Sequence, residues 1–506
     1  MNKINLSFIA ILFCCVLLLA GSCSSQKSTK LAVSKSEKIY DETWNSLKTH
    51  NTPDWLLGMK FGIYSHWSPL TTVCAMRKEK EMSYIDAIPY FTGEKFNADE
   101  WAAMYKSAGV QFAGALGMHC SGLCHWDSDI TQYDMVNYGP KKDVFGSLIK
   151  AIKKQGLKTL GSFHAMSPSS IWGRTSREDS TFREPTMFSD DLDYDDNWSW
   201  QQGWFERVQE AYNKYPLDML WFDCSFGNTI AGELKGYIYK GKFNYNGKRT
   251  IGGISETWQK KLIADYYNYM EGSGKTGEVI YKVNDIPANV GMRDIENGNL
   301  DGLQYDPWMA DINIMQHKYY PTTWFYNPKN PIKDANCIVD MLIDITSKNG
   351  RMLLNVPPQA DGSFTSTIKK EMADIGAWLK VNGEGIYDTN PWAIYGEGPT
   401  DIVHPGQHGQ GYEAGALMPK YTSDDIRYTC KNNTIYAFAL AEPKNNTVHM
   451  YALGSHQKLY PGEIKSITLL GSDATIEYKQ EDTELIVTLP KDRTKEYAYC
   501  LKIVRK

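Results

Sequence analysis

Between Asp41 and Trp392, short apolar runs alternate with amphipathic segments, and this alternation restricts the possible folds more than any other feature. The apolar runs at 60–66, 110–116, 157–163 and 218–223 are expected strands, and the segments at 97–108, 143–156 and 198–214 are expected helices. Strands that alternate with helices of about 10–15 residues indicate parallel strands joined by helical crossovers. Over about 350 residues, such units predict a (β/α)8-type barrel, with a doubly wound open sheet as the alternative.

Two of the expected helices have recognisable starts. Asn97 can cap the first, and Glu100 stands three residues later, which is the arrangement of a capping box. Asp143 opens the second, which carries its apolar residues on one face and stops at Gly156.

The pattern changes after Trp392. Gly and Pro cluster at 396–399 and at 405–415. The short β-rich runs that follow lie at 434–439, 448–452, 467–470, 485–489 and 497–504. Strands at this spacing, with turn residues between them, predict a small antiparallel β-sandwich. We therefore expect a barrel domain at 41–395 and a C-terminal sandwich at 396–506.

The N-terminus has the features of an export signal. Lys3 precedes an apolar run from Ile9 to Ala20, which is too short for a membrane-spanning helix, and small residues lead to Cys23. This order resembles a bacterial lipobox, in which the cysteine is lipidated. We expect residues 1–22 to be a lipoprotein signal peptide and 23–40 a flexible tether, with an ordinary signal peptide as the alternative. The protein would then be periplasmic or anchored in the outer membrane, with the lipid as its only membrane attachment.

Composition excludes several classes of function. The chain has 54 basic and 59 acidic residues, a net charge of −5, so nothing indicates a nucleic-acid partner. The absence of a phosphate-binding Gly-rich loop or a nucleotide fingerprint from the sequence means that no cofactor is expected. Outside the signal region, seven cysteines remain, an odd number with no regular disulfide framework. Aromatic residues make up 13% of the chain, and most are expected in cores.

Residues that could bind a ligand or take part in catalysis follow the expected strands. His66 and Trp67 follow the first strand, His119 the second, His164 the third, and Asp223 the fourth. In a parallel barrel, reactive groups stand at the C-terminal ends of the strands. An ionised carboxylate at the end of an apolar strand needs polar partners or a catalytic role. Asp223 could instead have a structural role as the cap of the next helix.

Several ordered motifs resemble glycoside hydrolase family 29, the α-L-fucosidases. FGIYSHW at 61–67 is similar to the opening of that family, and LWFD at 220–223 is similar to its nucleophile strand. The segment DITSKNGRMLLNV at 344–356, followed by GAWLKVNGEGIY at 376–387, is the closest match. The resemblance runs from Trp55 to Trp392, and a sandwich after the barrel also fits the family.

This resemblance implies a retaining glycosidase that acts on terminal α-L-fucosides in oligosaccharides or glycoconjugates. Asp223 would be the nucleophile. His66 and His119 would bind sugar hydroxyls, and Trp67, Trp221 and Trp308 would contribute to an aromatic pocket for a methyl-bearing deoxysugar. GSFHA at 161–165 stands where the family has GLYYS, and we expect His164 to substitute there as a hydroxyl ligand.

A retaining mechanism needs a second carboxyl, which protonates the leaving oxygen and then deprotonates water. Glu296 lies in DIENG at 294–298, just before the Pro307–Trp308 pair, and resembles an acid/base stretch of relatives. Glu256 in ISETW at 254–258 is the alternative.

The chain departs from the family pattern at some of these positions. MHCSGL at 118–123 stands where the family has KHHDGF, and Cys224 replaces the glycine after the nucleophile. Each lost polar group removes a partner for a sugar hydroxyl. The alternatives are therefore a glycosidase for a related sugar, such as an α-galactoside-like or other deoxyglycoside, or a non-catalytic glycan-binding protein.

A metal site is a further alternative. His119, Cys120, Cys124 and His125 offer four potential ligands within seven residues, and Cys224 could lie nearby. Because the paired CxxC spacing of zinc sites is missing, we expect no metal.

Overall fold

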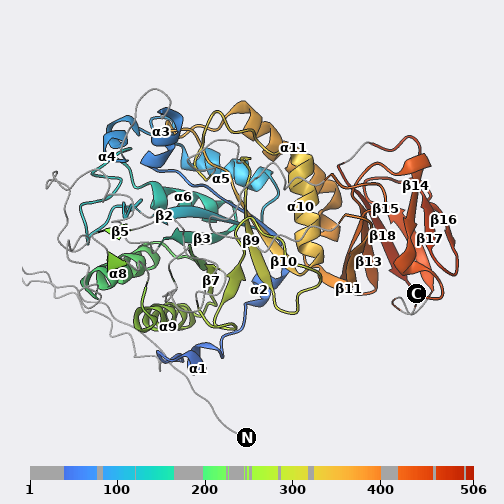
Figure 1. Ribbon diagram of the computed structural model, residues 1–506, viewed down its shortest axis with the longest axis horizontal. Helices are drawn as coiled ribbons and strands as arrows, with labels where there is room; N and C mark the ends of the chain where they lie inside the picture. Colours follow the sequence, from blue (N-terminus) through green and yellow to red (C-terminus); the bar gives the residue numbers. More distant parts are fainter. Residues whose placement is uncertain are drawn as a thin grey trace, which may run out of the picture. The chain divides into compact units, whose positions relative to one another are not determined.

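Eight parallel strands close into a barrel in the order β1-β10-β9-β8-β7-β4-β3-β2 (Figure 1). The computed structural model describes residues 39–76, 84–119, 121–164, 198–223, 226, 244–245, 248–249, 254–282, 286–316, 324–400, 420–457, 459, 463–494 and 497–506. The barrel strands are β1 (Phe61–Tyr64), β2 (Phe112–Met118), β3 (Lys158–Phe163), β4 (Met219–Phe222), β7 (Glu278–Lys282), β8 (Met292–Asp294), β9 (Trp308–Asn313) and β10 (Gly350–Asn355). The barrel prediction is confirmed, and the closed order excludes the open sheet.

In the part of the chain that the structure describes, six longer helices follow the barrel strands or connect them. They are α5 (Ala98–Ser107), α6 (Val144–Lys154), α8 (Trp198–Lys214), α9 (Glu256–Gly272), α10 (Ala335–Ser347) and α11 (Ser366–Asn382). Asn97 caps α5 by accepting from the Glu100 backbone N–H, and Asp143 caps α6 by accepting from that of Gly146. Both caps agree with the sequence prediction.

Shorter elements fill the connections. They are α1 (Trp44–Leu47), α2 (Asp54–Gly58), α3 (Pro69–Met76), α4 (Tyr84–Ala87), the 3-10 turns η1 (Ile88–Tyr90) and η3 (Gly383–Gly385), and a two-stranded ribbon of β5 (Asn244–Tyr245) and β6 (Lys248–Arg249).

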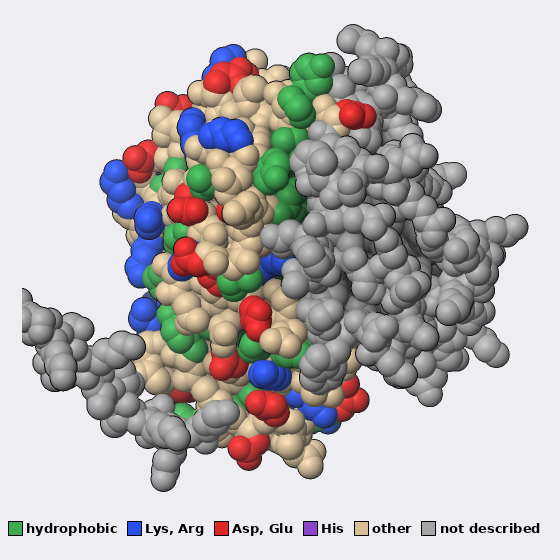
Figure 2. Space-filling view, turned by 90° about the vertical axis from the view of Figure 1, so that its left-hand side faces the viewer, with side chains coloured by type: hydrophobic (Ala, Val, Ile, Leu, Met, Phe, Trp, Pro, Cys, Tyr) green, Lys and Arg blue, Asp and Glu red, His purple; other side chains and the backbone are tan. Residues whose placement is uncertain are grey.

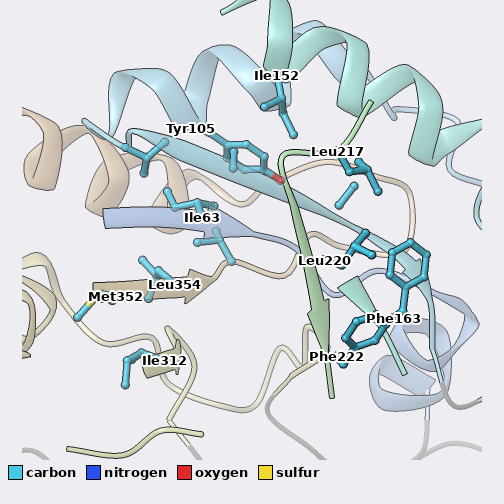
Figure 3. Close-up of a cluster of buried hydrophobic side chains, with 14 of the residues drawn as sticks. Ile63, Tyr105, Ile152, Phe163, Leu217, Leu220, Phe222, Ile312, Met352 and Leu354 are labelled. Carbon is cyan, nitrogen blue, oxygen red and sulfur yellow. The ribbon is translucent and has the colours of Figure 1, made fainter. Parts of the chain in front are cut away.

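Alternate side chains along each strand face opposite sides of the barrel wall. One cluster of buried residues takes members from all eight strands and fills the barrel interior, with Tyr64 from β1 and Trp221 from β4 among them. The neighbouring Ile63, Leu220 and Phe222 belong to a second cluster, which includes the apolar faces of the surrounding helices (Figure 3). This alternation determines which residues after each strand face inward.

The C-terminal region is an antiparallel β-sandwich, as predicted. One sheet has the order β11-β12-β13-β18-β15, and the other has the order β14-β17-β16. The strands are β11 (Asn390–Glu397), β12 (Ile426–Lys431), β13 (Thr434–Ala439), β14 (Thr447–Met450), β15 (Ile464–Leu469), β16 (Glu477–Gln480), β17 (Leu485–Thr488) and β18 (Tyr499–Arg505), with turns η4 (Lys444–Asn446) and η5 (Tyr451–Leu453). One apolar cluster joins both sheets.

Buried polar contacts join the sandwich to the barrel helices. Trp378 Nε1 of α11 donates to the Ala498 carbonyl at 3.0 Å. Arg427 of β12 forms an ion pair with Asp344 of α10, and both side chains are almost completely buried. On the face visible in Figure 2, acidic and basic side chains are interspersed across the coloured part.

The expected signal peptide, Cys23 and nearly all of the expected tether fall in residues 1–38, outside the described part of the chain. None of the helices in the described ranges is both long and apolar enough to cross a membrane.

Candidate active site

Polar side chains stand at the C-terminal end of every barrel strand. They are His66 after β1, His119 after β2, His164 after β3, Asp223 after β4, Lys282 at the end of β7, Glu296 shortly after β8, Asn313 at the end of β9 and Asn355 at the end of β10. Because all eight strands run the same way, their C-terminal ends form one mouth of the barrel. The candidate site is assembled there.

Asp223 is held by a histidine from the neighbouring strand. His164 Nδ1 lies 2.9 Å from Asp223 Oδ2, with the histidine side chain 1% exposed and the aspartate side chain 16% exposed. The Asp223 backbone N–H donates to the Phe163 carbonyl at 3.1 Å, which continues the β3–β4 pairing by one residue. Since Phe222 faces the outer layer, Asp223 faces the barrel mouth.

Three imidazoles lie next to this carboxylate. His66 Nε2 is 3.4 Å from His164 Nε2, and the rings of His119 and His164 are 4.1 Å apart between centroids. Burial lowers the pKa of His66 to about 3 and that of His119 well below its ordinary value, so both rings are neutral at pH 7. Neutral imidazoles can each offer a donor and an acceptor to a hydroxyl-bearing ligand.

Glu296 is a buried carboxylate on the other half of the barrel mouth. Trp324 Nε1 donates to its Oε1 at 3.1 Å, and Lys282 Nζ lies 4.0 Å from its Oε2. Lys282 Nζ also lies 4.6 Å from the centroid of the Trp221 ring. Burial alone would lower the pKa of Lys282, but the surrounding carboxylates, Glu296 and Asp223 among them, raise it well above its ordinary value. Both candidate carboxylates therefore act on the same ammonium group.

Two further carboxylates lie beside Lys282. Its Nζ is 2.8 Å from Asp294 Oδ2 and 2.6 Å from Asp311 Oδ1, and Tyr64 donates its hydroxyl to Asp311 Oδ2 at 3.3 Å. Burial raises the pKa of Asp294, and burial followed by the charge of Asp294 raises that of Asp311. Burial is the largest cause of both shifts, so these two carboxyls retain protons more readily than exposed ones.

The family profile described as Alpha-L-fucosidase matches residues 27–384, and the Alpha-L-fucosidase C-terminal domain profile matches residues 420–504. The chain belongs to the alpha-L-fucosidase family. It is therefore a glycoside hydrolase.

Tissue alpha-L-fucosidase of Rattus norvegicus and plasma alpha-L-fucosidase of Homo sapiens are each 22% identical to the chain, over 89% of both sequences. The Thermotoga maritima alpha-fucosidase in complex with fucose has a TM-score of 0.67 at 22% identity and covers 92% of this chain and 100% of its own. An alpha-L-fucosidase of Bacteroides thetaiotaomicron has a TM-score of 0.63 at 17% identity and covers 90% of this chain and 95% of its own. These structures share the barrel-and-sandwich fold.

The structure brings together six of the residues selected from the sequence of this glycoside hydrolase. They are His66, His119, His164, Trp221, Asp223 and Glu296. Trp221 lies in the barrel interior, with its ring 5.5 Å from Tyr64 and 6.2 Å from His164.

Two of the predicted tryptophans lie elsewhere. Trp67 is 1% exposed, packs against Phe91, Phe96 and Trp101, and donates its indole N–H to the Gln359 carbonyl at 2.8 Å. Trp308 begins β9, so it lies at the end of that strand remote from the barrel mouth. Its indole N–H donates to the Lys348 carbonyl at 3.0 Å. The structure does not bring either ring to the histidine cluster.

Glu256, the alternative acid/base, is also outside this group. It is the first residue of α9, and its side chain is 59% exposed. Its Oε1 accepts from Trp44 Nε1 at 2.8 Å and from Lys260 Nζ at 3.0 Å. The hydrogen bond from Lys260 lowers the pKa of the Glu256 carboxyl, which makes it a poor proton donor.

The sequence reasoning missed Lys282, Asn355, Asp311 and Trp324. Lys282 and Asn355 end β7 and β10, so the rule that identified Asp223 applies equally to them. Trp324 is outside any strand, and no local pattern marks it as a partner of Glu296.

Among the described residues, one group could hold a metal ion, and it consists of His66, His119 and His164. Cys120 and Cys224, which belong to the metal alternative considered from the sequence, lie outside the described residues.

Proposed function

We propose that this protein hydrolyses terminal α-L-fucosidic bonds in oligosaccharides or glycoconjugates with net retention of anomeric configuration. The observation that carries the proposal is the pair of carboxyls at the barrel mouth. Asp223 is held by His164, and Glu296 lies across the site beside Lys282 and Trp324. Double displacement needs two carboxyls about 5–5.5 Å apart, one to attack carbon and one to transfer protons.

In the first step, Asp223 attacks the anomeric carbon while Glu296 protonates the leaving oxygen. In the second step, Glu296 takes a proton from water, and the water displaces Asp223 from the sugar. His164 Nδ1 at 2.9 Å orients the Asp223 carboxylate and stabilises its charge before attack and after release. Glu296 is buried beside Trp324, and burial generally favours the protonated form of a carboxyl, which suits the acid in the first step.

Substrate recognition would combine polar and apolar contacts. His66 and His119 are neutral and can donate to one sugar hydroxyl while accepting from another. Phe325 lies 5.5 Å from His66 and 5.1 Å from His119 between ring centroids, and Trp221 faces the same interior. An apolar wall beside directed hydroxyl partners suits a sugar with a methyl group on one face.

Hydrolysis of a chromogenic α-L-fucoside by wild type and by Asp223→Ala tests the activity. We expect the variant to lose at least about 10³-fold in kcat, since nucleophile and acid/base act as a unit. Proton NMR should show the α-anomer of fucose as the first product. A first-formed β-anomer would overturn double displacement.

The acid/base assignment has its own test with a matched control. Glu296→Ala should lose far more activity on a poor leaving group than on an activated aryl fucoside, and azide should restore part of it. Glu256→Ala removes an exposed carboxylate and should match wild type on both substrates. Azide rescue of Glu256→Ala, with none for Glu296→Ala, would reverse the assignment.

The identity of the sugar is tested with a panel of fucosides, α-galactosides and other deoxyglycosides. We expect fucosides to give the highest kcat/KM. If another sugar gave the highest kcat/KM, the proposed mechanism would stand, but the proposed substrate would be wrong. If wild type and Asp223→Ala were equally inert on every glycoside but still bound glycan, the protein would be a glycan receptor.

We also propose that the chain is exported and anchored through a lipid on Cys23. The support is the basic start, the short apolar run and the small residues before Cys23. Mass spectrometry of the mature N-terminal peptide should find a diacylglyceryl-modified cysteine, and Cys23→Ala should release the protein from the membrane fraction. A wild-type protein that is processed but not acylated would support the ordinary signal peptide.

A further inference from the structure

The histidine cluster has a spacing suited to a metal ion. One ring nitrogen from each of His66, His119 and His164 lies within 4.8 Å of the other two. One edge, from His66 Nε2 to His164 Nε2, is 3.4 Å. In tetrahedral zinc sites with Zn–N bonds of about 2.0–2.1 Å, two ligand nitrogens are about 3.3–3.4 Å apart. One edge of the cluster therefore already has the required length.

The hydrogen bonds around His66 determine which of its nitrogens carries the proton. Asn355 Nδ2 donates to the Trp324 carbonyl at 2.8 Å and to Asn313 Oδ1 at 3.3 Å, so its Oδ1 is the atom that faces His66. That oxygen accepts from the His66 backbone N–H at 2.9 Å and lies 3.3 Å from His66 Nδ1. His66 Nδ1 must donate to it, so the neutral ring has its lone pair on Nε2.

The same reasoning applies to His164. Its Nδ1 lies 2.9 Å from Asp223 Oδ2, and an ionised carboxylate can only accept. Nδ1 therefore carries the proton, and a neutral His164 also has its lone pair on Nε2. Two lone pairs then face each other across 3.4 Å, an arrangement that a cation between the rings would stabilise.

The surroundings favour a metal as that cation. The far nitrogens of His66 and His164 face an amide oxygen and a carboxylate, the outer partners that orient metal-bound imidazoles. His119 Nδ1 is buried and has no hydrogen-bond partner among the described residues.

We propose that His66, His119 and His164 form a binding site for a divalent transition-metal ion of the zinc type. The ion would occupy the place of sugar hydroxyls beside Asp223 and would inhibit glycoside hydrolysis reversibly. The inhibition rests on the proposed function, whereas binding of the metal does not.

Binding is tested directly with the metal alone. The purified full chain, stripped with chelator, is titrated with Co²⁺ by visible absorption and with Zn²⁺ by calorimetry. We expect one ion per chain and the visible bands of a low-coordinate cobalt site. His164→Phe should weaken binding by at least about 100-fold, since loss of an outer partner alone costs about 10–100-fold.

The controls separate this site from other ligands. His449→Phe removes an exposed sandwich histidine that pairs with Glu484, and it should bind Zn²⁺ as wild type does. His164→Gln is the second variant if His164→Phe does not fold, with circular dichroism to verify the fold of each. Asp223→Asn should bind about 10–100-fold more weakly, because it removes the carboxylate partner of His164.

Three results would overturn the proposal. The first is a wild type that shows no heat of Zn²⁺ binding and no cobalt bands. A shared proton, and not a metal ion, would then lie between the rings of His66 and His164. The second is unchanged affinity in the folded His164 variants. The third is a thiolate-to-cobalt absorption band, which would mean that a cysteine replaces one of the imidazoles. None of these measurements uses a glycoside, so failure of the proposed hydrolysis would be seen separately.

Discussion

Lys282→Met tests how far the buried charges at the barrel mouth depend on one ammonium group. Lys282 Nζ lies 2.8 Å from Asp294 Oδ2 and 2.6 Å from Asp311 Oδ1, and the three side chains are at most 2% exposed. Methionine retains most of the aliphatic length of lysine, so packing changes little. The two carboxylates lose their counter-ion.

The size of the effect follows from these distances. At an effective dielectric constant of about 20, each contact supplies about 6 kcal/mol of Coulomb attraction before desolvation is subtracted. Desolvation offsets part of this, and we expect a net loss of about 3–5 kcal/mol, as is usual when one partner of a buried pair is removed. Unfolding entropy of about 2.1 cal/mol/K per residue, over roughly 470 residues from Ile39 onwards, converts this into a Tm lower by about 3–5 °C.

The loss should depend on pH with a defined sign. Burial already raises the pKa of Asp294 and Asp311, and removal of the ammonium raises both further. A carboxyl with a higher pKa in the folded than in the unfolded state binds more protons when folded, so low pH favours folding. The variant should be weakest relative to wild type near pH 7 and should recover as the pH falls towards the ordinary carboxyl pKa of about 3.9.

Calorimetric melts of both proteins at pH 7 and pH 5 measure this difference. Lys260→Met is the matched control, because it breaks a Lys–Glu contact of 3.0 Å that is exposed, and exposed pairs contribute at most about 1 kcal/mol. A Tm for Lys282→Met within 1 °C of wild type at pH 7 would refute the reasoning. A fall in the Tm of Lys260→Met equal to that of Lys282→Met would also refute it.

Three further changes have defined outcomes. Arg427→Met removes the partner that links Asp344 to the sandwich and leaves Lys348 as the cation beside this buried carboxylate, so we expect a loss of about 1.5–3 kcal/mol, the usual size for a hydrogen bond to a charged group; an unchanged calorimetric transition would contradict this. Gly203→Ala lies inside α8, and among the described side chains the nearest atom to the new Cβ is Arg207 Nη1 at 4.0 Å, so the change should raise stability by about 0.5–1 kcal/mol in thermal melts; any destabilisation would contradict this. Burial lowers the pKa of His125 to about 3, so below pH 6.5 the unfolded state takes up a proton that the folded state does not. Between pH 7 and pH 5, the free energy of unfolding of His125→Gln should therefore fall by about 2 kcal/mol less than that of wild type. An equal fall in both proteins would exclude this effect.

Local chemistry explains why much of the fold was predictable. The caps at Asn97 and Asp143 depend on side chains within three residues of the helix start, so the sequence contains all the information they need. Closure of the barrel is a long-range property, but strand–helix alternation over this length leaves few other arrangements.

The positions of Trp67 and Lys282 could have been predicted from the two-residue period of a strand. Tyr64 faces the interior and His66 faces the mouth, so Trp67 must turn outward, where it meets the aromatic residues below α5. On β7, Ile280 faces inward, and Lys282 therefore does so as well. Family resemblance selected residue types near the motif, whereas the period determines the direction in which each side chain points.

Other features depend on contacts that no local pattern contains. Trp308 seemed suited to the pocket because it follows a proline near Glu296, yet it begins its strand rather than ending it. Trp324 lies in the connection after β9, outside any strand, and donates to Glu296 after the neighbouring β8. Both outcomes depend on strand register around the closed barrel, which the pairing of β8, β9 and β10 determines in three dimensions.

The two halves of the barrel mouth have opposite chemical character, and this difference supports the proposed division of roles. On the side of β1 to β4, the described carboxylate at the barrel mouth is Asp223, and it faces a donor on His164, which stabilises the ionised form that a nucleophile requires. On the side of β7 to β10, Asp294, Asp311 and Glu296 surround the ammonium of Lys282, and burial is the largest cause that raises the pKa of both aspartates. A general acid must arrive at the substrate with a proton, so it is better placed in this second half. To exchange the roles, Asp223 would have to carry a proton against the donor on His164, and Glu296 would have to attack as an anion from the half that already has excess negative charge.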